Sequence, residues 1–181
     1  MGLRSDSRRY GWVAIALHWA MAAAIVGLFG LGLWMTGLDY YSPWYQKAPW
    51  LHKSVGILVL LVLLLRVLWR VLDRPPAPLG EPGSGMVYAA RLAHASLYLL
   101  ILAVAISGYL ISTADGRAIE VFTWFDVPAT LHGYANQEDL AGELHEWLAW
   151  GLIALSVLHA LAALKHHFID RDRTLIRMFG R

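Results

Sequence analysis

The sequence predicts an all-α fold, a transmembrane four-helix bundle, from its composition and from the grouping of its apolar residues. Of 181 residues, 58% are hydrophobic and only 15% are charged, whereas soluble proteins carry about 25% charged residues. The apolar residues gather in four long segments, and about 20 such residues cross the hydrocarbon core of a membrane as a helix. Because lipid offers the backbone no hydrogen-bond partners, each segment should be helical. We predict a single membrane domain over residues 1–181.

The four helices are expected at about 12–36, 50–72, 87–113 and 142–167. The first follows the basic stretch RSDSRRYGW, which resembles the start of a secretory signal. Its apolar run continues to Met35, longer than the apolar part of a normal signal, so we expect it to remain as a helix. The second helix carries Lys53 near its start and Arg66 and Arg70 near its end, whereas the centres of the other three lack charge.

Two connections carry further information. Residues 73–85, DRPPAPLGEPGSG, are rich in proline and glycine and predict a loop between the second and third helices. The segment 112–141 is longer and mixes aromatic with turn residues, and we expect a short helix within it.

The basic residues predict the orientation, because lysine and arginine are enriched in cytoplasmic loops. Twelve of the fifteen basic residues lie on one side, so both termini should be cytoplasmic. These are Arg4, Arg8, Arg9, Arg66, Arg70, Arg74, Arg91, Lys165, Arg171, Arg173, Arg177 and Arg181. Only Lys47, Lys53 and Arg117 remain on the outer side, together with eight acidic residues. The formal net charge of +2 is too small and too scattered to indicate nucleic-acid binding.

Histidines inside the apolar segments are the candidate functional residues, since ionisable side chains within a membrane are costly. His145 and His159 lie fourteen residues apart on the fourth helix. This spacing separates them by about 21 Å along the axis and returns them to nearly the same face. At the outer level, His52 is the expected partner of His145. At the inner level, His18 and His94 both lie at the depth of His159, and the spacing does not choose between them.

Paired imidazoles can bind a metal, relay protons, or ligate a haem iron from both sides. A bare zinc or copper site usually needs further ligands, and the chain has no cysteine. Two ligands suffice for haem, and the absence of CxxCH indicates non-covalent haem b. Small residues beside the histidines leave space for a flat macrocycle: Ala14, Ala22, Gly56, Ala141, Gly142, Ala149, Ala162 and Ala163. The competing interpretation is that the histidines and small residues serve helix packing alone.

The chain resembles the prokaryotic cytochrome b561 family over essentially its whole length. The resemblance lies in ALHW, LHKSVGI with LLLRVLWR, LAHASLYLLILAVAISGY, LHEWLAWGLIALSVLHALAALKHHF and the tail DRTLIRMFGR. It implies a bacterial inner-membrane protein with two b haems stacked across the membrane. It also implies that His18 pairs with His159 and His52 with His145, and that His94 is not a ligand. Two histidine ligands leave no open position on iron, which favours electron transfer over oxygen activation.

The resemblance further implies exchange with ubiquinone or ubiquinol, and oxidation of superoxide at the outer face. His94 and His166 are the expected quinone-side residues, and Lys47, Lys53 and Arg117 the expected basic entrance for an anion. Candidates to pair with haem propionates are Arg66, Arg70, Arg91 and Lys53. The acidic outer face argues against superoxide, because an anion is steered by positive potential. Two other hypotheses remain: an anchor subunit for a separate hydrogenase- or dehydrogenase-type complex, and a haem-free structural membrane protein.

Overall fold

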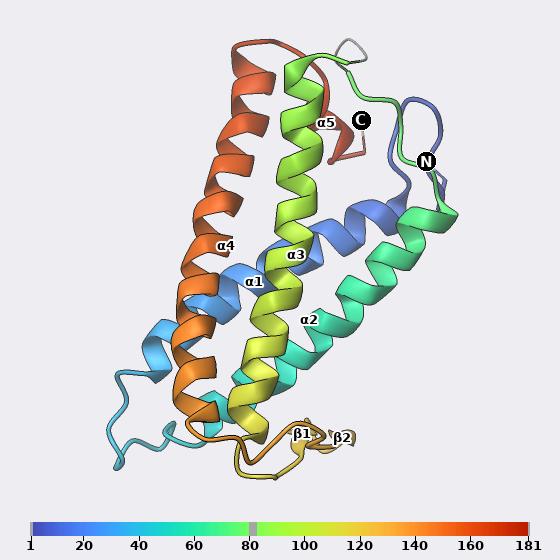
Figure 1. The fold of residues 1–181 in the computed structure, drawn as a ribbon. Coiled ribbons are helices and arrows are strands. Elements are labelled where there is room, and N and C mark those ends of the chain that lie inside the picture. Colours follow the sequence, from blue (N-terminus) through green and yellow to red (C-terminus); the bar gives the residue numbers. More distant parts are fainter. Residues whose placement is uncertain (1, 80–82, 181) are drawn as a thin grey trace.

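The computed structural model describes residues 2–79 and 83–180 and contains four long helices, a small β-hairpin and a short terminal helix (Figure 1). The long helices are α1 (Trp12–Met35), α2 (Lys47–Leu72), α3 (Gly85–Thr113) and α4 (Gln137–Phe168). The remaining elements are β1 (Ile119–Val121), β2 (Phe125–Val127) and α5 (Thr174–Arg177). All four long helices are long and apolar enough to cross a membrane. The predicted transmembrane four-helix bundle is therefore confirmed.

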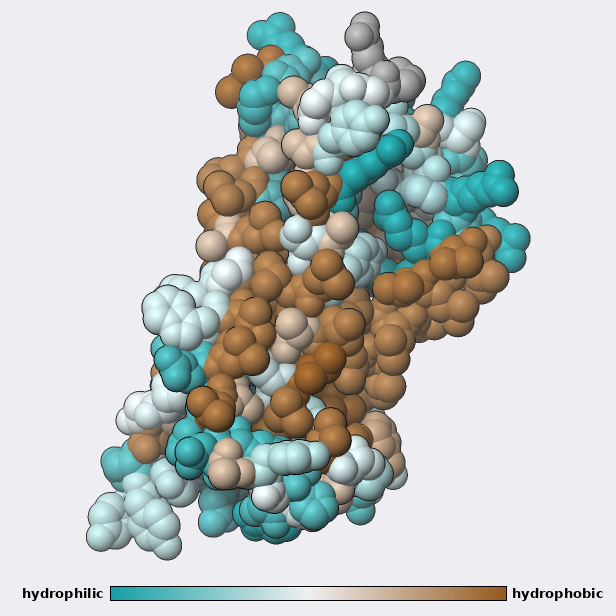
Figure 2. All heavy atoms as spheres, viewed as in Figure 1, coloured by the Kyte–Doolittle hydropathy of each residue, from teal (hydrophilic) through white to brown (hydrophobic). Residues whose placement is uncertain are grey.

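The helices pack mainly as two pairs, α1 with α2 and α3 with α4, joined by contacts between α2 and α3. Figure 1 shows α3 and α4 nearly parallel, with α1 and α2 running obliquely to them. Every long helix contributes to one buried cluster in the middle of the bundle, which we call the central cluster. It consists of Met21, Val59, Leu63, Ile101 and Leu152. On the face shown in Figure 2, apolar residues cover the middle of the molecule and hydrophilic residues gather at both ends.

The two ends of the bundle differ in what they carry (Figure 1). The tail end holds both chain termini and the α2–α3 connection, which comprise residues 2–11, 73–79, 83–84 and 169–180. The hairpin end holds the α1–α2 connection and the β-hairpin, residues 36–46 and 114–136. Seven of the twelve basic residues predicted to share one side lie in these tail-end segments, and Arg181 lies outside the described residues. The other four, Arg66, Arg70, Arg91 and Lys165, lie in the adjoining turns of the long helices.

The prediction of a short helix within residues 112–141 is wrong, because this segment forms the antiparallel hairpin of β1 and β2. Val121 pairs with Phe125, and Phe122 and Thr123 turn the chain with φ of 48° and 62°. β-Branched and aromatic residues favour strands. The hairpin also gains an anchor on α2, since the fully buried Ser54 hydroxyl donates to the Glu120 carbonyl and accepts from the Phe122 amide.

Helix α4 begins five residues before its predicted start at 142. Asn136 precedes it with φ of 55°, a left-handed conformation that asparagine tolerates. Glu138 and Asp139 stand in the first turn, where negative charge is favourable at a helix N-terminus. Gln137 donates its side-chain amide to the carbonyls of Leu110 and Leu131, so the extra turn is also tied to its neighbours.

The N-terminal segment is fastened to the end of α2. The carboxylate of Asp73, which is only 8% exposed, accepts hydrogen bonds from the Ser5 amide and, at 2.7 Å, from the Ser5 hydroxyl. The Ser5 hydroxyl in turn accepts from the Gly11 amide at 3.0 Å. This contact brings residues 2–5 against the start of α1, where the backbone amide of Trp12 donates to the Gly2 carbonyl.

We expect Gly11→Ala to lower the thermal unfolding midpoint of the detergent-solubilised protein. A Cβ atom at Gly11 would collide with the backbone of Leu3, Arg4 and Ser5, and such overpacking costs about 1–3 kcal/mol. Gly27→Ala on α1 is the matched control, since a Cβ there meets nothing within 4 Å. Equal midpoints for the two variants would show that the N-terminal segment does not contribute to stability.

Candidate functional site

His52 of α2 and His145 of α4 lie together towards the hairpin end, and we call them the hairpin-end pair. Their ring centres are 6.2 Å apart, with the planes at 69°. The Nδ1 atom of His145 lies 3.0 Å from the Val104 carbonyl oxygen and 3.1 Å from the Ser107 hydroxyl. Because a carbonyl oxygen only accepts, Nδ1 must carry the hydrogen, which leaves the lone pair on Nε2. This tautomer is the one that a metal-binding histidine adopts when its other nitrogen is held by a carbonyl.

Two glycines that the sequence analysis did not single out receive the rings of this pair. A Cβ at Gly108 of α3 would stand 3.1 Å from His145 Cε1, and one at Gly32 of α1 would stand 3.4 Å from His52 Cε1. Each imidazole therefore packs against bare backbone. Gly56 and Gly142 were expected to leave space beside the histidines, and a Cβ at either one meets nothing within 4 Å.

His18 of α1 and His159 of α4 lie together towards the tail end, and we call them the tail-end pair. Their ring centres are 6.4 Å apart, with the planes at 68°. His94 of α3 also approaches His159, with ring centres 5.3 Å apart. The structure thus brings all three inner-level candidates together.

The spacing within each pair matches the demands of a metal held from both sides. An imidazole nitrogen lies about 2 Å from a metal that it binds, and the ring centre lies about 1 Å behind that nitrogen. Two rings on opposite sides of one iron therefore have centres about 6 Å apart. The hairpin-end and tail-end pairs meet this spacing, whereas the 5.3 Å between His94 and His159 falls short of it. His52 also has a buried Nδ1 with no hydrogen-bond partner among the described residues.

Arg66 lies directly against the tail-end pair. Its Nη2 atom is 3.1 Å from His18 Nδ1, and its Nη1 atom is 3.8 Å from the Met21 sulfur. Its guanidinium carbon lies 5.6 Å from the centre of the Tyr98 ring. Of the predicted propionate partners, Arg66 is therefore the one whose guanidinium contacts a candidate ligand.

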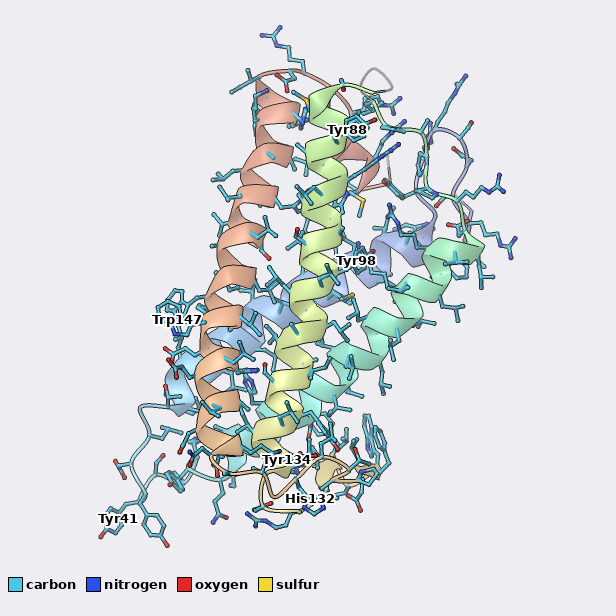
Figure 3. The ribbon with its side chains drawn as sticks, in the orientation of Figure 1. Tyr41, Tyr88, Tyr98, His132, Tyr134 and Trp147 are labelled. Carbon is cyan, nitrogen blue, oxygen red and sulfur yellow. The ribbon has the colours of Figure 1, made fainter. Side chains whose placement is uncertain are left out.

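A cavity of about 630 Å³ lies between α2 and α3 at the tail end. Its polar lining consists of Arg70, Arg91, His94 and Tyr98, and its apolar lining comes from both helices. Figure 3 shows Tyr98 partway along α3. The cavity adjoins the tail-end pair through His94, whose ring approaches that of His159.

The basic residues predicted for an outer entrance are exposed at the hairpin end of the bundle. Lys47 and Lys53 are exposed on the first turns of α2. Arg117 is exposed too, but its Nε donates to Asp115 at 2.6 Å, and this hydrogen bond lowers the pKa of the Asp115 carboxyl. Arg117 therefore has a carboxylate beside it, in an exposed ion pair that water screens. His132 lies at this end in an exposed loop (Figure 3).

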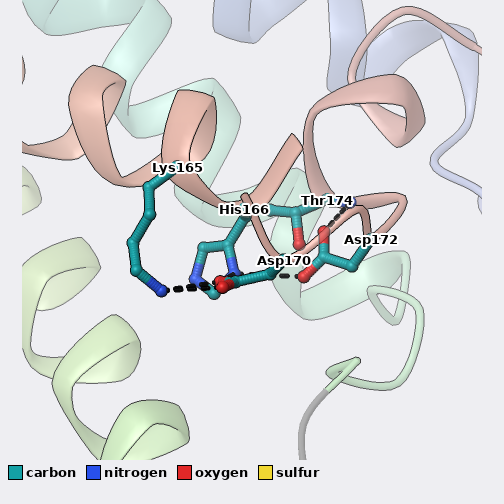
Figure 4. Close-up of polar contacts among 5 residues, drawn as sticks. All are labelled: Lys165, His166, Asp170, Asp172 and Thr174. Atoms are coloured by element: carbon teal, nitrogen blue, oxygen red, sulfur yellow. Dashed lines mark hydrogen bonds and ion pairs between the residues drawn. The ribbon is translucent and has the colours of Figure 1, made fainter. Parts of the chain in front are cut away.

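His166, predicted on the quinone side, takes part in a polar cluster after α4 (Figure 4). Its Nδ1 lies 2.9 Å from an Asp170 oxygen and 3.0 Å from an Asp172 oxygen. Lys165 contacts Asp170 at 2.8 Å, and Asp172 accepts the Thr174 amide at 2.7 Å. His166 thus lies beside two carboxylates, at the start of the turn that leads to α5.

Comparison with known proteins decides the family. A family model described as prokaryotic cytochrome b561 matches residues 9–181. The chain belongs to the prokaryotic cytochrome b561 family. It is therefore a membrane electron-transfer protein. Membership of a cytochrome b family implies that it binds haem b, which argues against the haem-free hypothesis.

Three relatives show how the chain sits within this family. It is 55% identical over 181 residues to cytochrome b561 homolog 2 of Escherichia coli K12, covering 100% of this chain and 96% of that protein. It is 28% identical to the probable superoxide oxidase CybB of Yersinia pestis, with 94% and 96% coverage. It is 29% identical to cytochrome b562 of Cereibacter sphaeroides, with 93% and 94% coverage.

Proposed function

We propose that this cytochrome carries electrons across the membrane between a donor at the hairpin end and a quinone at the tail end. The observation that carries the proposal is the presence of two imidazole pairs at two depths, each with ring centres about 6 Å apart. His52 and His145 hold one haem b, and His18 and His159 hold the second. When bound, haem b supplies one-electron redox chemistry, and two histidines per iron leave no position for oxygen.

The choice of His18 over His94 as a ligand is supported by distance. The His18 ring centre lies 6.4 Å from that of His159, which suits ligands on opposite sides of an iron. The His94 ring lies 5.3 Å from the same histidine and has one side in the cavity between α2 and α3. His94 is thus free to contact a second molecule beside the pair.

The cavity between α2 and α3 is the proposed quinone site. A quinone needs an apolar recess for its ring and hydrogen-bond donors for its carbonyl oxygens, and His94 and Tyr98 provide such donors next to aliphatic residues. Reduction to a quinol takes two electrons and two protons, so His94 is placed to pass a proton. Arg70 and Arg91, on the same lining, pair with haem propionates. Lys53 is the corresponding candidate at the hairpin end.

We further propose that the tail end is cytoplasmic and that the protein lies in a bacterial inner membrane. The basic residues named in the sequence analysis gather at the tail end, and such residues favour the cytoplasmic side. The quinone then receives its protons from the cytoplasm.

Superoxide is the first donor to test, because the relative from Yersinia pestis is named a probable superoxide oxidase. Each superoxide loses one electron to become dioxygen, so two are consumed for each quinol formed. Arg117 is paired with Asp115, which leaves Lys47 and Lys53 as the unpaired basic residues of the predicted entrance among the described contacts. A partner dehydrogenase is the second candidate donor, because the hairpin end is predominantly acidic and suits a basic protein surface better than an anion.

The first experiment is a reduced-minus-oxidised visible spectrum of the purified protein with quantitation of haem per chain. We expect two low-spin b haems per polypeptide. In a second step, ubiquinol and superoxide are each added to the oxidised protein, and we expect both to reduce it. Haem contents of one or zero would contradict the proposal of two histidine-ligated sites. Reduction by ubiquinol but not by superoxide would direct the search to a protein donor.

A further inference from the structure

The two imidazole pairs are surrounded by groups of opposite character. At the hairpin-end pair, His145 Nδ1 faces the Val104 carbonyl at 3.0 Å and must donate its hydrogen. At the tail-end pair, His18 Nδ1 faces the Arg66 guanidinium at 3.1 Å. Arginine only donates, so this nitrogen accepts in the observed contact. If His18 binds iron through Nε2, its hydrogen must stand on Nδ1, so the guanidinium has to turn away from the ring while its charge stays beside the pair. One pair therefore faces a hydrogen-bond acceptor and the other faces a fixed positive charge.

These surroundings would shift the reduction potential of a bound iron in opposite directions at the two pairs. A histidine that donates to a carbonyl becomes a stronger electron donor to its metal and stabilises the oxidised state. A nearby positive charge stabilises an added electron, and its effect is large where water is excluded. The hydrogen-bond partners of the hairpin-end pair in the described part of the chain are neutral, the Val104 carbonyl and the Ser107 hydroxyl.

Of the basic side chains named near the two pairs, Arg66 is the least exposed. Arg70 and Arg91 line the cavity beside the tail-end pair, next to His94. Lys53, the sequence neighbour of His52, is exposed, and so are Arg70 and Arg91, so water screens all three charges alike. Arg66, by contrast, is only partly exposed and contacts Met21 and Tyr98.

We propose that the positive charge of Arg66, which lies beside His18, raises the reduction potential at the tail-end pair above that at the hairpin-end pair. The proposal rests on the proposed function, in which each pair holds one haem. It gives electron flow a direction, from the hairpin end to the tail end, and it distinguishes Arg66 from Arg70 and Arg91, which line the cavity. If His18 binds iron through Nε2, its Nδ1 cannot accept from Arg66, so the guanidinium would turn towards a propionate. From there its charge would still favour the reduced tail-end site.

The first test compares the reduction potentials of the tail-end and hairpin-end sites in protein that keeps Arg66. Redox titration followed in the visible spectrum should resolve two components. The tail-end component is the one that remains in His145→Ala, and the hairpin-end component is the one that remains in His159→Ala. We expect the tail-end component to have the higher potential. The reverse order would overturn the inference even if no Arg66 variant could be purified.

The second test removes the charge. Arg66→Met should lower the tail-end potential enough to change the electron distribution about tenfold or more, which corresponds to about 59 mV for a one-electron couple. The hairpin-end component should not move. Arg66→Lys keeps the charge and should remain close to the unsubstituted protein. Arg74→Met removes an exposed arginine beyond the end of α2 and is the matched control for charge on this side.

The outcomes separate this inference from the proposed function. Two components whose potentials do not respond to Arg66→Met, or that both shift equally, would overturn the role of Arg66 and leave the two histidine pairs in place. A single component, or none, in the unsubstituted protein would instead overturn the proposal that each pair holds a haem, and this inference with it.

Discussion

Replacing His145 with alanine is expected to halve the haem content of the purified protein, from two haems per chain to one. The variant removes one of the two imidazoles that face each other at 6.2 Å, and His52 alone cannot hold an iron from both sides. The tail-end pair lies two turns beyond the central cluster and shares no side chain with His145, so its haem should stay. Pyridine haemochrome quantitation and the low-spin spectrum measure both results.

His132→Ala is the control for this change, because it removes an exposed histidine from a loop at the same end of the bundle. It should leave two haems. Unchanged haem content in His145→Ala would show that His145 is not a ligand. Loss of both haems from a protein that still elutes as a folded monodisperse species would show that the two sites are not independent.

The second large effect distinguishes the two candidate partners of His159. His18→Ala should remove the tail-end haem, because the 6.4 Å spacing of these rings suits ligands on opposite sides of one iron. His94→Ala should keep both haems and slow the reaction with quinone instead, because His94 lines the cavity beside the pair. Haem quantitation and quinol-dependent reduction, measured on both variants, test the assignment.

The two substitutions serve as controls for each other, since both remove an imidazole close to His159. Loss of the tail-end haem from His94→Ala, with retention in His18→Ala, would exchange their roles. An unchanged rate with quinol in His94→Ala would place the quinone away from the cavity between α2 and α3.

Much of the fold could be predicted because hydropathy dominates the behaviour of a membrane chain. A run of apolar residues has one stable conformation in lipid, so the four helices followed from composition alone. The hairpin of β1 and β2 lies outside the apolar spans, where hydropathy carries no such constraint. It is held to α2 by Ser54, whose hydroxyl donates to the Glu120 carbonyl, 66 positions away, and accepts from the Phe122 amide in the turn. No local pattern contains that information.

The candidate site divides in the same way. Helical spacing predicted that His145 and His159 lie at two depths on one face of their helix. Matching depths then predicted His52 as the partner of His145, and either His18 or His94 as the partner of His159. The groups that surround the imidazoles were beyond this reasoning, because Ser107, Gly108 and Arg66 reach them from other helices. A serine followed by a glycine inside an apolar helix was the available signal for the first two. The contact of Arg66 with His18 required the crossing of α1 and α2.

The central cluster has a consequence for energy conversion. Met21, Val59, Leu63, Ile101 and Leu152 occupy the middle of the bundle, and none of these side chains can carry a proton. Leu152 lies seven residues from both His145 and His159, so the cluster separates the two pairs. In the proposed function, an electron that passes this layer is not accompanied by a proton through these side chains, so each transfer would move charge across the membrane. A voltage of 100 mV is worth about 2.3 kcal/mol for each charge that crosses the full membrane. With the tail end in the cytoplasm, as proposed, the negative voltage inside the cell would oppose electrons that move towards that end, so the resting voltage would slow the proposed reaction.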